Sequence, residues 1–267
     1  MPPSPTSAWR SGRRQWPSLP DAASDLAHGR GEGLLAAALL AVTAPVLVFP
    51  AMNARMYRNA AVQENLSILA RRGVRVAEPS AGALACGEEG PGRMPEPVEI
   101  AEEIFRALAP VHDLQGVHVL VTAGPTHEYL DPVRYISNPS TGRMGLAMAR
   151  AAWYRDAEVR VILGPVDPAP CSLYGLEVTR VVSALDMRDA VMANLDWARL
   201  IVKAAAVGDY RARDRQPHKM KREGREALSL DLVQNPDIAA EVGANKRPDQ
   251  VLIGFAAETD DIQSGRG

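Results

Sequence analysis

The stretch Thr122-Ala-Gly-Pro-Thr-His-Glu-Tyr-Leu-Asp-Pro-Val-Arg-Tyr-Ile-Ser-Asn-Pro-Ser-Thr-Gly-Arg-Met-Gly145 decides the fold. An apolar run at 117–122 precedes it and is typical of a strand, and apolar residues at helical spacing follow from Met144. The segment Ser140-Thr141-Gly142 is predicted to cap the start of that helix. A strand, a glycine turn, a polar loop and a helix in this order predict an anion site, because the N-terminus of a helix favours phosphate.

The sequence on either side alternates apolar runs with helical patterns, which is typical of doubly wound α/β domains. Upstream, we expect residues 79–97 to form an irregular loop, because they are rich in glycine and proline. Downstream, we expect Ser183 to cap a helix. The predicted strands are 46–49, 74–77, 117–122, 159–163, 178–182, 200–207, 228–233 and 251–255, and the other predicted helices are 34–42, 60–72 and 100–108.

The composition is that of a globular protein, with 267 residues, 46% of them apolar and 23% charged. A net charge of -2 gives no broad electrostatic reason to expect nucleic acid or an anionic membrane as a partner. Two cysteines, Cys86 and Cys171, exclude a disulfide framework and fit a reducing cytoplasm. We therefore expect a cytoplasmic α/β protein that binds anions locally.

One uncharged run, residues 33–52, is long enough to cross a membrane. Pro45 interrupts it, and the residues after Pro45 are β-branched and aromatic, so a buried helix, a turn and a buried strand are the better interpretation. Residues 1–24 are expected to form a disordered leader. The remainder is expected to divide into domains at 25–112 and 116–267.

The stretch 122–145 closely resembles the opening motif of phosphopantothenate-cysteine ligases, which have a Rossmann-like doubly wound domain. The resemblance implies that Asn138 is catalytic and assists turnover of an acyl-nucleotide intermediate. An amide suits this role because it can donate a hydrogen bond to developing negative charge without titrating. The resemblance also implies CTP as cosubstrate, Mg²⁺ as cofactor, and 4'-phosphopantothenate and cysteine as substrates. We expect no metal ligand from the protein.

Four later segments also resemble the ligase family, at 203–211, 219–222, 235–238 and 254–259. The segment Lys203-Ala-Ala-Ala-Val-Gly-Asp-Tyr-Arg211 matches its nucleotide motif, and Lys219 matches a lysine that neutralises the triphosphate, so it is also a catalytic candidate. Asn235-Pro-Asp-Ile238 has the form of a helix start, with Asn235 as N-cap and Pro236 at the first helical position. The residues to which the resemblance assigns nucleotide binding are Lys203, Ala204, Ala205, Asp209, Lys219, Pro236, Asp237, Ile238, Ala239 and Phe255.

The upstream region resembles phosphopantothenoylcysteine decarboxylase, a flavodoxin-like family that uses FMN. Pro50-Ala-Met-Asn-Ala-Arg-Met-Tyr57 matches its substrate motif, which implies substrate binding by Asn53 and Met56. Residues 85–94 match its substrate flap, which implies that Arg93 binds substrate and that Cys86 is a catalytic proton donor. The family's first strand, flavin loop and histidine base have no match here, so we expect a partial decarboxylase domain with the FMN site largely missing.

These matches extend from about residue 26 to residue 259, and the ligase family normally continues further with two more lysines. The sequence therefore predicts a bifunctional ligase and decarboxylase of coenzyme A biosynthesis, truncated at both ends, from a family that forms homo-oligomers. Two alternatives stay open: a non-catalytic binding or assembly subunit, and a Rossmann-type oxidoreductase. The second is disfavoured because Gly142-x-x-Gly145 is not a dinucleotide fingerprint.

Overall fold

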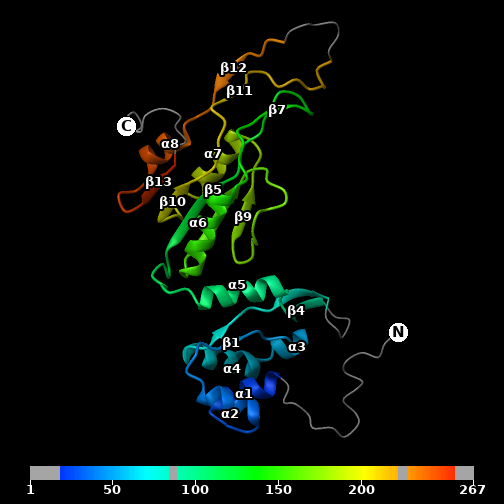
Figure 1. Cartoon of the computed structure of the whole chain (residues 1–267), viewed down its shortest axis with the longest axis vertical. Coiled ribbons are helices and arrows are strands. Elements are labelled where there is room, and N and C mark those ends of the chain that lie inside the picture. The colour runs from blue at the N-terminus through cyan, green and yellow to red at the C-terminus, as the bar shows by residue number, and fades with distance from the viewer. Residues whose placement is uncertain (1–18, 84–88, 222–227, 256–267) are drawn as a thin grey trace, which may run out of the picture. The chain divides into compact units, whose positions relative to one another are not determined.

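The computed structural model describes residues 19–83, 89–221 and 228–255. The chain divides into two compact units, residues 1–107 and residues 108–267 (Figure 1). The first unit has one buried apolar cluster, and the second unit has two.

The first unit packs helices around a short parallel pair of strands. Its elements before residue 77 are α1 (Leu19–His28), α2 (Leu34–Ala41), β1 (Leu47–Val48), α3 (Ala54–Tyr57), α4 (Ala60–Arg71) and β2 (Arg75–Val76). Leu26 of α1 packs against Leu69 of α4 in its core. Because α1 begins at residue 19, the prediction of a disordered leader is wrong for residues 19–24.

Residues 79–97 were predicted to be irregular, and that prediction is wrong. Strands β3 (Ser80–Ala83) and β4 (Glu89–Arg93) pair in an antiparallel manner, and α5 (Pro97–Ala107) follows them. Glycine permits this hairpin to approach the chain before α3, because a Cβ at Gly92 would clash with the carbonyl oxygen of Met52. The amide of Met52 donates to the carbonyl of Gly92 at 2.9 Å.

The second unit is built on a five-stranded parallel sheet. Its strands are β5 (His118–Ala123), β8 (Glu158–Leu163), β9 (Glu177–Arg180), β10 (Leu200–Lys203) and β13 (Val251–Gly254), in the order β13-β10-β5-β8-β9. All four neighbouring pairs are parallel, so the predicted α/β fold class is confirmed.

Helices cover both faces of this sheet, as in a doubly wound domain (Figure 1). On one face, α6 (Arg143–Tyr154) packs Leu146 with Val119 and Val121. On the other face, α7 (Ala184–Ala193) and α8 (Ile238–Asn245) pack with Leu120. Val119 and Val121 lie in one cluster and Leu120 in the other, because successive side chains of a strand point to opposite faces of the sheet.

Two short antiparallel ribbons accompany the main sheet. One pairs β6 (Glu128–Tyr129) with β7 (Tyr135–Ile136), and the other pairs β11 (Tyr210–Ala212) with β12 (Leu232–Gln234). The predicted strand at 228–233 is therefore shorter and belongs to a ribbon rather than to the parallel sheet.

The structure confirms one predicted helix cap, narrows a second to a single residue and corrects a third. Ser183 and Asp186 form the full capping box of α7. The N-cap of α6 is Gly142, the last residue of the predicted capping segment, which has a left-handed φ of 70° and supplies no side-chain cap. The N-cap of α8 is Asp237 and not Asn235, so Pro236 precedes the helix. Among the described residues, no helix has the length and apolar character needed to span a membrane.

Candidate functional site

The direction in which the chain adds strands to the sheet reverses between β5 and β10. The chain runs outward from β5 to β8 and β9, and returns on the other side of β5 as β10. Ligands of open parallel sheets bind at such a switch point, beyond the carboxyl ends of the strands. The loops that leave β5 and β10 there, residues 124–142 and 204–209, contain the two best-matched motifs.

Backbone hydrogen bonds join these two loops to each other. Pro125 and Ala206 form an isolated parallel bridge beyond the ends of the strands. The amide of Ala206 donates to the carbonyl of Gly124 at 2.9 Å, and the amide of Thr126 donates to the carbonyl of Ala206 at 3.3 Å. The two motifs therefore form one surface at the switch point.

Asn138 lies on this surface and contacts the second loop. Its Nδ2 group donates to the carbonyl of Val207 at 3.0 Å, and its side chain is accessible to solvent. The adjacent Ser137 hydroxyl donates to the carbonyl of Thr126 at 2.7 Å, which fixes the backbone next to Asn138. Because an amide nitrogen carries two hydrogens, Asn138 can hold this loop and still donate to a ligand.

Gly208 is held by two buried side chains from different parts of the chain. The Thr126 hydroxyl accepts a hydrogen bond from the amide of Gly208 at 2.9 Å, and Asn235 Nδ2 donates to the carbonyl of Gly208 at 2.7 Å. The amide of Asn235 also donates to the carbonyl of Asp209 at 2.7 Å. Asn235 thus orders the turn at Asp209 instead of capping a helix, while the Asp209 side chain stays exposed.

Of the four residues 236–239 that were predicted to bind the nucleotide, only Asp237 has an exposed side chain. Ile238 is buried in the core among residues of α7 and α8. The Asp237 carboxylate caps α8 and accepts from the amides of Ala239 and Ala240 at 2.8 and 3.0 Å. Pro236 is half-buried, so the accessible polar group of this segment is the carboxylate of Asp237.

Lys203 lies at the carboxyl end of β10, next to Thr122 of β5 in the strand register. Burial lowers the pKa of its ammonium group, and the negative charge of Asp237 partly opposes that effect. Ala204 and Ala205 follow, and the hydroxyl of Thr122 accepts from the amide of Ala205 at 3.3 Å. Phe255 donates its amide to the carbonyl of Lys203 at 3.2 Å and keeps its ring exposed.

The N-terminus of α6 is fixed close to the end of β5. A Cβ at Gly145 would lie 2.6 Å from the Cβ of Ala123, so only glycine permits this approach. Gly142, at a left-handed φ, lies against the backbone of Gly124. The first N–H groups of α6 therefore stand at the switch point, where they can receive an anion.

The Lys219 side chain is exposed, and its backbone neighbour is anchored to the first loop. The amide of Met220 donates to Asp131 Oδ2 at 3.0 Å. The guanidinium of Arg134 donates from Nη1 both to Asp131 Oδ2 and to the carbonyl of Met220, each at 2.8 Å. The structure thus links the Lys219 segment to the loop that carries Asn138.

Several residues of the site had no role in the sequence-based prediction. Thr126, Glu128 and Asp131 are polar, buried and hydrogen-bonded within it. Of these, only Asp131 had a usable local signal, because Asp before Pro is typical of a turn held by the aspartate side chain. The ring of His127 also stacks on that of Tyr135, with centroids 3.8 Å apart. Burial lowers the pKa of His127, and the negative charge of Glu128 opposes this effect.

In the first unit, the structure brings together most of the predicted substrate residues. Asn53 caps α3 by accepting the amide of Arg55 at 2.7 Å, and Met56 is exposed on the same short helix. The bond between Met52 and Gly92 joins this segment to β4, which ends at Arg93. Arg93 pairs with Glu96. Cys86 lies outside the described residues.

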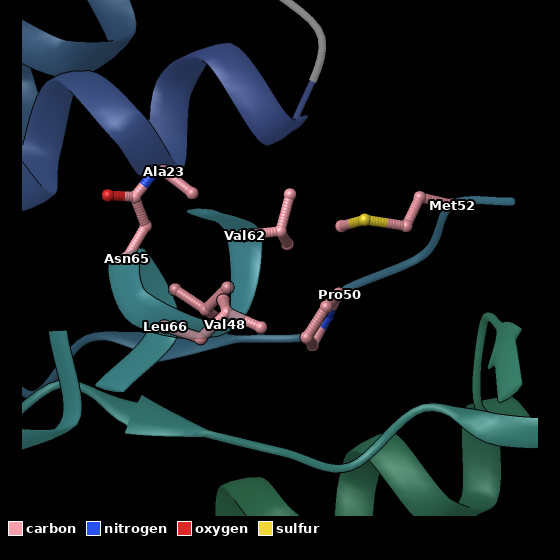
Figure 2. A pocket seen from close by; sticks show the side chains of 7 residues that line it. All are labelled: Ala23, Val48, Pro50, Met52, Val62, Asn65 and Leu66. Carbon is pink, nitrogen blue, oxygen red and sulfur yellow. The ribbon is translucent and has the colours of Figure 1, made fainter. Parts of the chain in front are cut away.

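Neither a flavin-sized cavity beside Met52 nor a cluster of metal ligands is present among the described residues. The cavity beside Met52 has a volume of about 10 Å³, and Figure 2 shows Met52 pointing toward Val62 across it. Such a space is on the scale of one water molecule and does not fit a flavin ring. Within residues 19–83, 89–221 and 228–255 there is no group of three or more His, Cys, Asp or Glu side chains placed to hold a metal ion. Mg²⁺ can instead be held by the phosphates of a substrate and by water.

The sheet, its switch point and the helices on both faces place the second unit in the doubly wound α/β class. Residues 114–266 match the family described as DNA/pantothenate metabolism flavoprotein C-terminal domain, and residues 23–109 match the family described as Flavoprotein. The chain belongs to the DNA/pantothenate metabolism flavoprotein family.

Relatives with this domain pair are named Coenzyme A biosynthesis bifunctional protein CoaBC. The protein of Escherichia coli K12 is 43% identical over 250 residues, and that of Bacillus subtilis 168 is 44% identical over 253 residues. Each alignment covers 92% of this chain, and the chain spans 61% of the length of each relative. A crystal structure of the C-terminal domain of a CoaBC protein is 37% identical, with a TM-score of 0.49, and covers 57% of this chain and 70% of that one.

Proposed function

We propose that residues 108–267 carry a CTP-dependent ligase site that joins 4'-phosphopantothenate to cysteine. The observation that carries the proposal is the contact of Asn138 with the 204–209 loop at the switch point, where nucleotide-binding sheets place their ligands. The relatives named for coenzyme A biosynthesis support this choice of reaction.

The reaction would proceed in two substitutions. The carboxylate of phosphopantothenate attacks the α-phosphorus of CTP, an acyl-cytidylate forms, and pyrophosphate leaves. The amine of cysteine then attacks the acyl carbon and loses a proton, the amide bond forms, and CMP leaves. Mg²⁺ bound to the triphosphate would neutralise charge during the first substitution.

Asn138 would act in the second substitution. The tetrahedral intermediate carries negative charge on the former carbonyl oxygen, and an amide N–H aimed at that oxygen stabilises it. The bonds of Asn138 to Val207 and of Ser137 to Thr126 hold the carboxamide in place before substrate binds. Catalysis would therefore depend on positioning and charge stabilisation.

The nucleotide would lie between the small residues at 204–205 and the turn at Asp209. The exposed Asp209 carboxylate can accept a hydrogen bond from the sugar or the base, and the exposed Phe255 ring can pack beside the base. Lys219 and the partly buried Lys203 would face the negative charge of the phosphates. Pro236 and Asp237 would border the site from the start of α8, with Ile238 and Ala239 behind them.

The proposal can be tested by incubating the full chain with CTP, Mg²⁺, 4'-phosphopantothenate and cysteine. We expect release of pyrophosphate that requires phosphopantothenate, and a product detected by mass spectrometry. Asn138→Ala should slow amide formation by about 100-fold, the order of magnitude for loss of one oxyanion donor. Asn245→Ala is the matched control, because Asn245 is exposed and, within the described part of the chain, its side chain bonds locally to the carbonyl of Glu241 in α8.

Two results would contradict the ligase assignment. Binding of CTP without any pyrophosphate release would favour the non-catalytic binding subunit, and binding of a nicotinamide dinucleotide in place of CTP would favour the oxidoreductase.

For the first unit we propose a role in holding the phosphopantothenoylcysteine product through Asn53, Met56 and Arg93. The hydrogen bond between Met52 and Gly92 supports this proposal, since it draws the two substrate motifs together. No flavin-dependent step is assigned to the small cavity beside Met52. Retention of the ligation product by wild type but not by Asn53→Ala, measured by calorimetry, tests this role.

A further inference from the structure

Asp131 is a fully buried carboxylate in the loop between β6 and β7. It accepts four hydrogen bonds, which come from the amides of Val133, Arg134 and Met220 and from the Arg134 guanidinium. A buried carboxylate is stable only with such partners, because loss of its hydration must be offset. The proposed ligase chemistry uses no group on Asp131 itself.

The two oxygens of Asp131 have separate partners. Oδ1 accepts from the amides of Val133 and Arg134 at 2.7 and 2.8 Å and thereby forms a local turn. Oδ2 accepts from Arg134 Nη1 at 2.8 Å and from the amide of Met220 at 3.0 Å. One oxygen therefore shapes the loop, and the other attaches a segment that is 89 residues away in sequence.

Two further bonds attach the same distant segment. Arg134 Nη1 donates to the carbonyl of Met220 at 2.8 Å, and the amide of Gln216 donates to the carbonyl of Leu130 at 2.8 Å. Both polar groups of the Met220 backbone are therefore fixed by the 130–134 loop. Since Lys219 directly precedes Met220, its Cα is fixed as well, while its side chain remains exposed.

We propose that Asp131 is a positioning residue that holds Lys219 at the loop of Asn138, so that the Lys219 ammonium meets the phosphates of a nucleoside triphosphate. This inference rests on the proposed ligase function and adds a determinant of its nucleotide affinity. Asp131 acts through the backbone of Met220 and does not touch the substrate.

Asp131→Asn separates the two roles of the carboxylate. An asparagine Oδ1 still accepts from Val133 and Arg134, whereas its Nδ2 presents hydrogens to the donors of Arg134 and Met220. Met220→Pro removes the same bond from the other side, because proline has no N–H. Asp231→Asn is the control, since Asp231 is exposed on the neighbouring ribbon and pairs only with Arg213 in the described contacts.

Hydrogen exchange of the Met220 amide and the kinetics of CTP are the two measurements. In wild type we expect the Met220 amide to exchange at least about tenfold more slowly than in an unstructured peptide, and Asp131→Asn should abolish that protection. Both variants should raise the KM for CTP by about tenfold to 100-fold, with kcat nearly unchanged. This range corresponds to the loss of one hydrogen bond between the Lys219 ammonium group and the phosphates. A loss of stability alone would not raise the KM for one substrate selectively.

An unprotected Met220 amide in wild type would overturn the inference even if neither variant folded. A folded Asp131→Asn chain with rapid exchange at Met220 and an unchanged KM for CTP would also overturn it. Calorimetric CTP binding without phosphopantothenate keeps the two proposals separable. Weaker CTP binding by Asp131→Asn supports the positioning role even if wild type forms no product, and in that case only the proposed function fails.

Discussion

Two glycines in helices, Gly145 in α6 and Gly243 in α8, should respond in opposite ways to alanine. Alanine is favoured over glycine in a helix by about 1 kcal/mol. At Gly243 an added Cβ meets no atom within 4 Å, so Gly243→Ala should stabilise the protein by up to about 1 kcal/mol. It therefore measures the helix-propensity effect without a packing effect.

At Gly145 the same propensity gain is opposed by a steric clash. The new Cβ would lie 2.6 Å from the Cβ of Ala123 and 2.9 Å from the carbonyl oxygen of Thr122. Helix α6 must then move away from β5, and overpacking of this kind costs about 1–3 kcal/mol. Gly145→Ala should therefore be less stable than Gly243→Ala by about 1–3 kcal/mol, which is the overpacking effect alone.

Urea unfolding followed by tryptophan fluorescence is a suitable assay, because Trp153 is a buried residue of α6. In a thermal scan, each 1 kcal/mol should shift the Tm by about 2–4 °C for a unit of this size. If Gly145→Ala is as stable as Gly243→Ala, the close contact between α6 and β5 is wrong, and so is the position of the helix N-terminus at the switch point.

Three further predictions concern the polar groups of the site. Thr126→Val leaves the buried amide of Gly208 without its acceptor, and should reduce the free energy of unfolding by about 1–3 kcal/mol in urea. Burial opposes ionisation of Asp131, but its hydrogen bonds outweigh burial and lower its pKa from 3.8 to about 2. Its stabilisation should therefore be complete above pH 3.8 and be lost as the pH falls toward 2, as acid titration by circular dichroism would reveal. Asp237→Asn keeps a capping side chain but removes the charge that opposes burial, so the pKa of Lys203 should fall further, as the pH dependence of its acetylation would show.

The first prediction has a control variant, and each of the other two has a result that would contradict it. Thr179→Val changes an exposed threonine of β9 and should alter stability by less than about 0.5 kcal/mol. An acid transition that is identical in wild type and Asp131→Asn would disprove the role of the Asp131 hydrogen bonds. A higher pKa for Lys203 in Asp237→Asn would mean that Asp237 does not stabilise the ammonium form.

The sequence predicted the parallel sheet and its helices because their apolar periodicity is local and strong. It failed where a tertiary partner overrode a local signal. Asn235 has the form of an N-cap, yet its carboxamide binds the carbonyl of Gly208, and Asp237 caps the helix. The hairpin of β3 and β4 was missed because its glycines suggested irregular structure, although they permit the approach to Met52.

The resemblance predicted a catalytic role for Asn138, and the structure adds the bond from its side chain to the carbonyl of Val207. The sequence does not distinguish Thr126 from a solvated loop residue, and Asp131 before Pro132 indicates only a local turn. Their importance depends on partners at Gly208 and Met220, which are 82 and 89 residues away.

The hydrogen-bonded turn at Gly208 bears on how the proposed site would discriminate between nucleobases. The amide of Gly208 donates to Thr126 and its carbonyl accepts from Asn235, so hydrogen bonds within the protein already order this turn. A nucleotide that binds there, as proposed, loses little affinity to the entropy of ordering a loop. Discrimination between nucleobases would then arise from a rigid template whose fixed dimensions reject a larger base, and not from closure around the correct one.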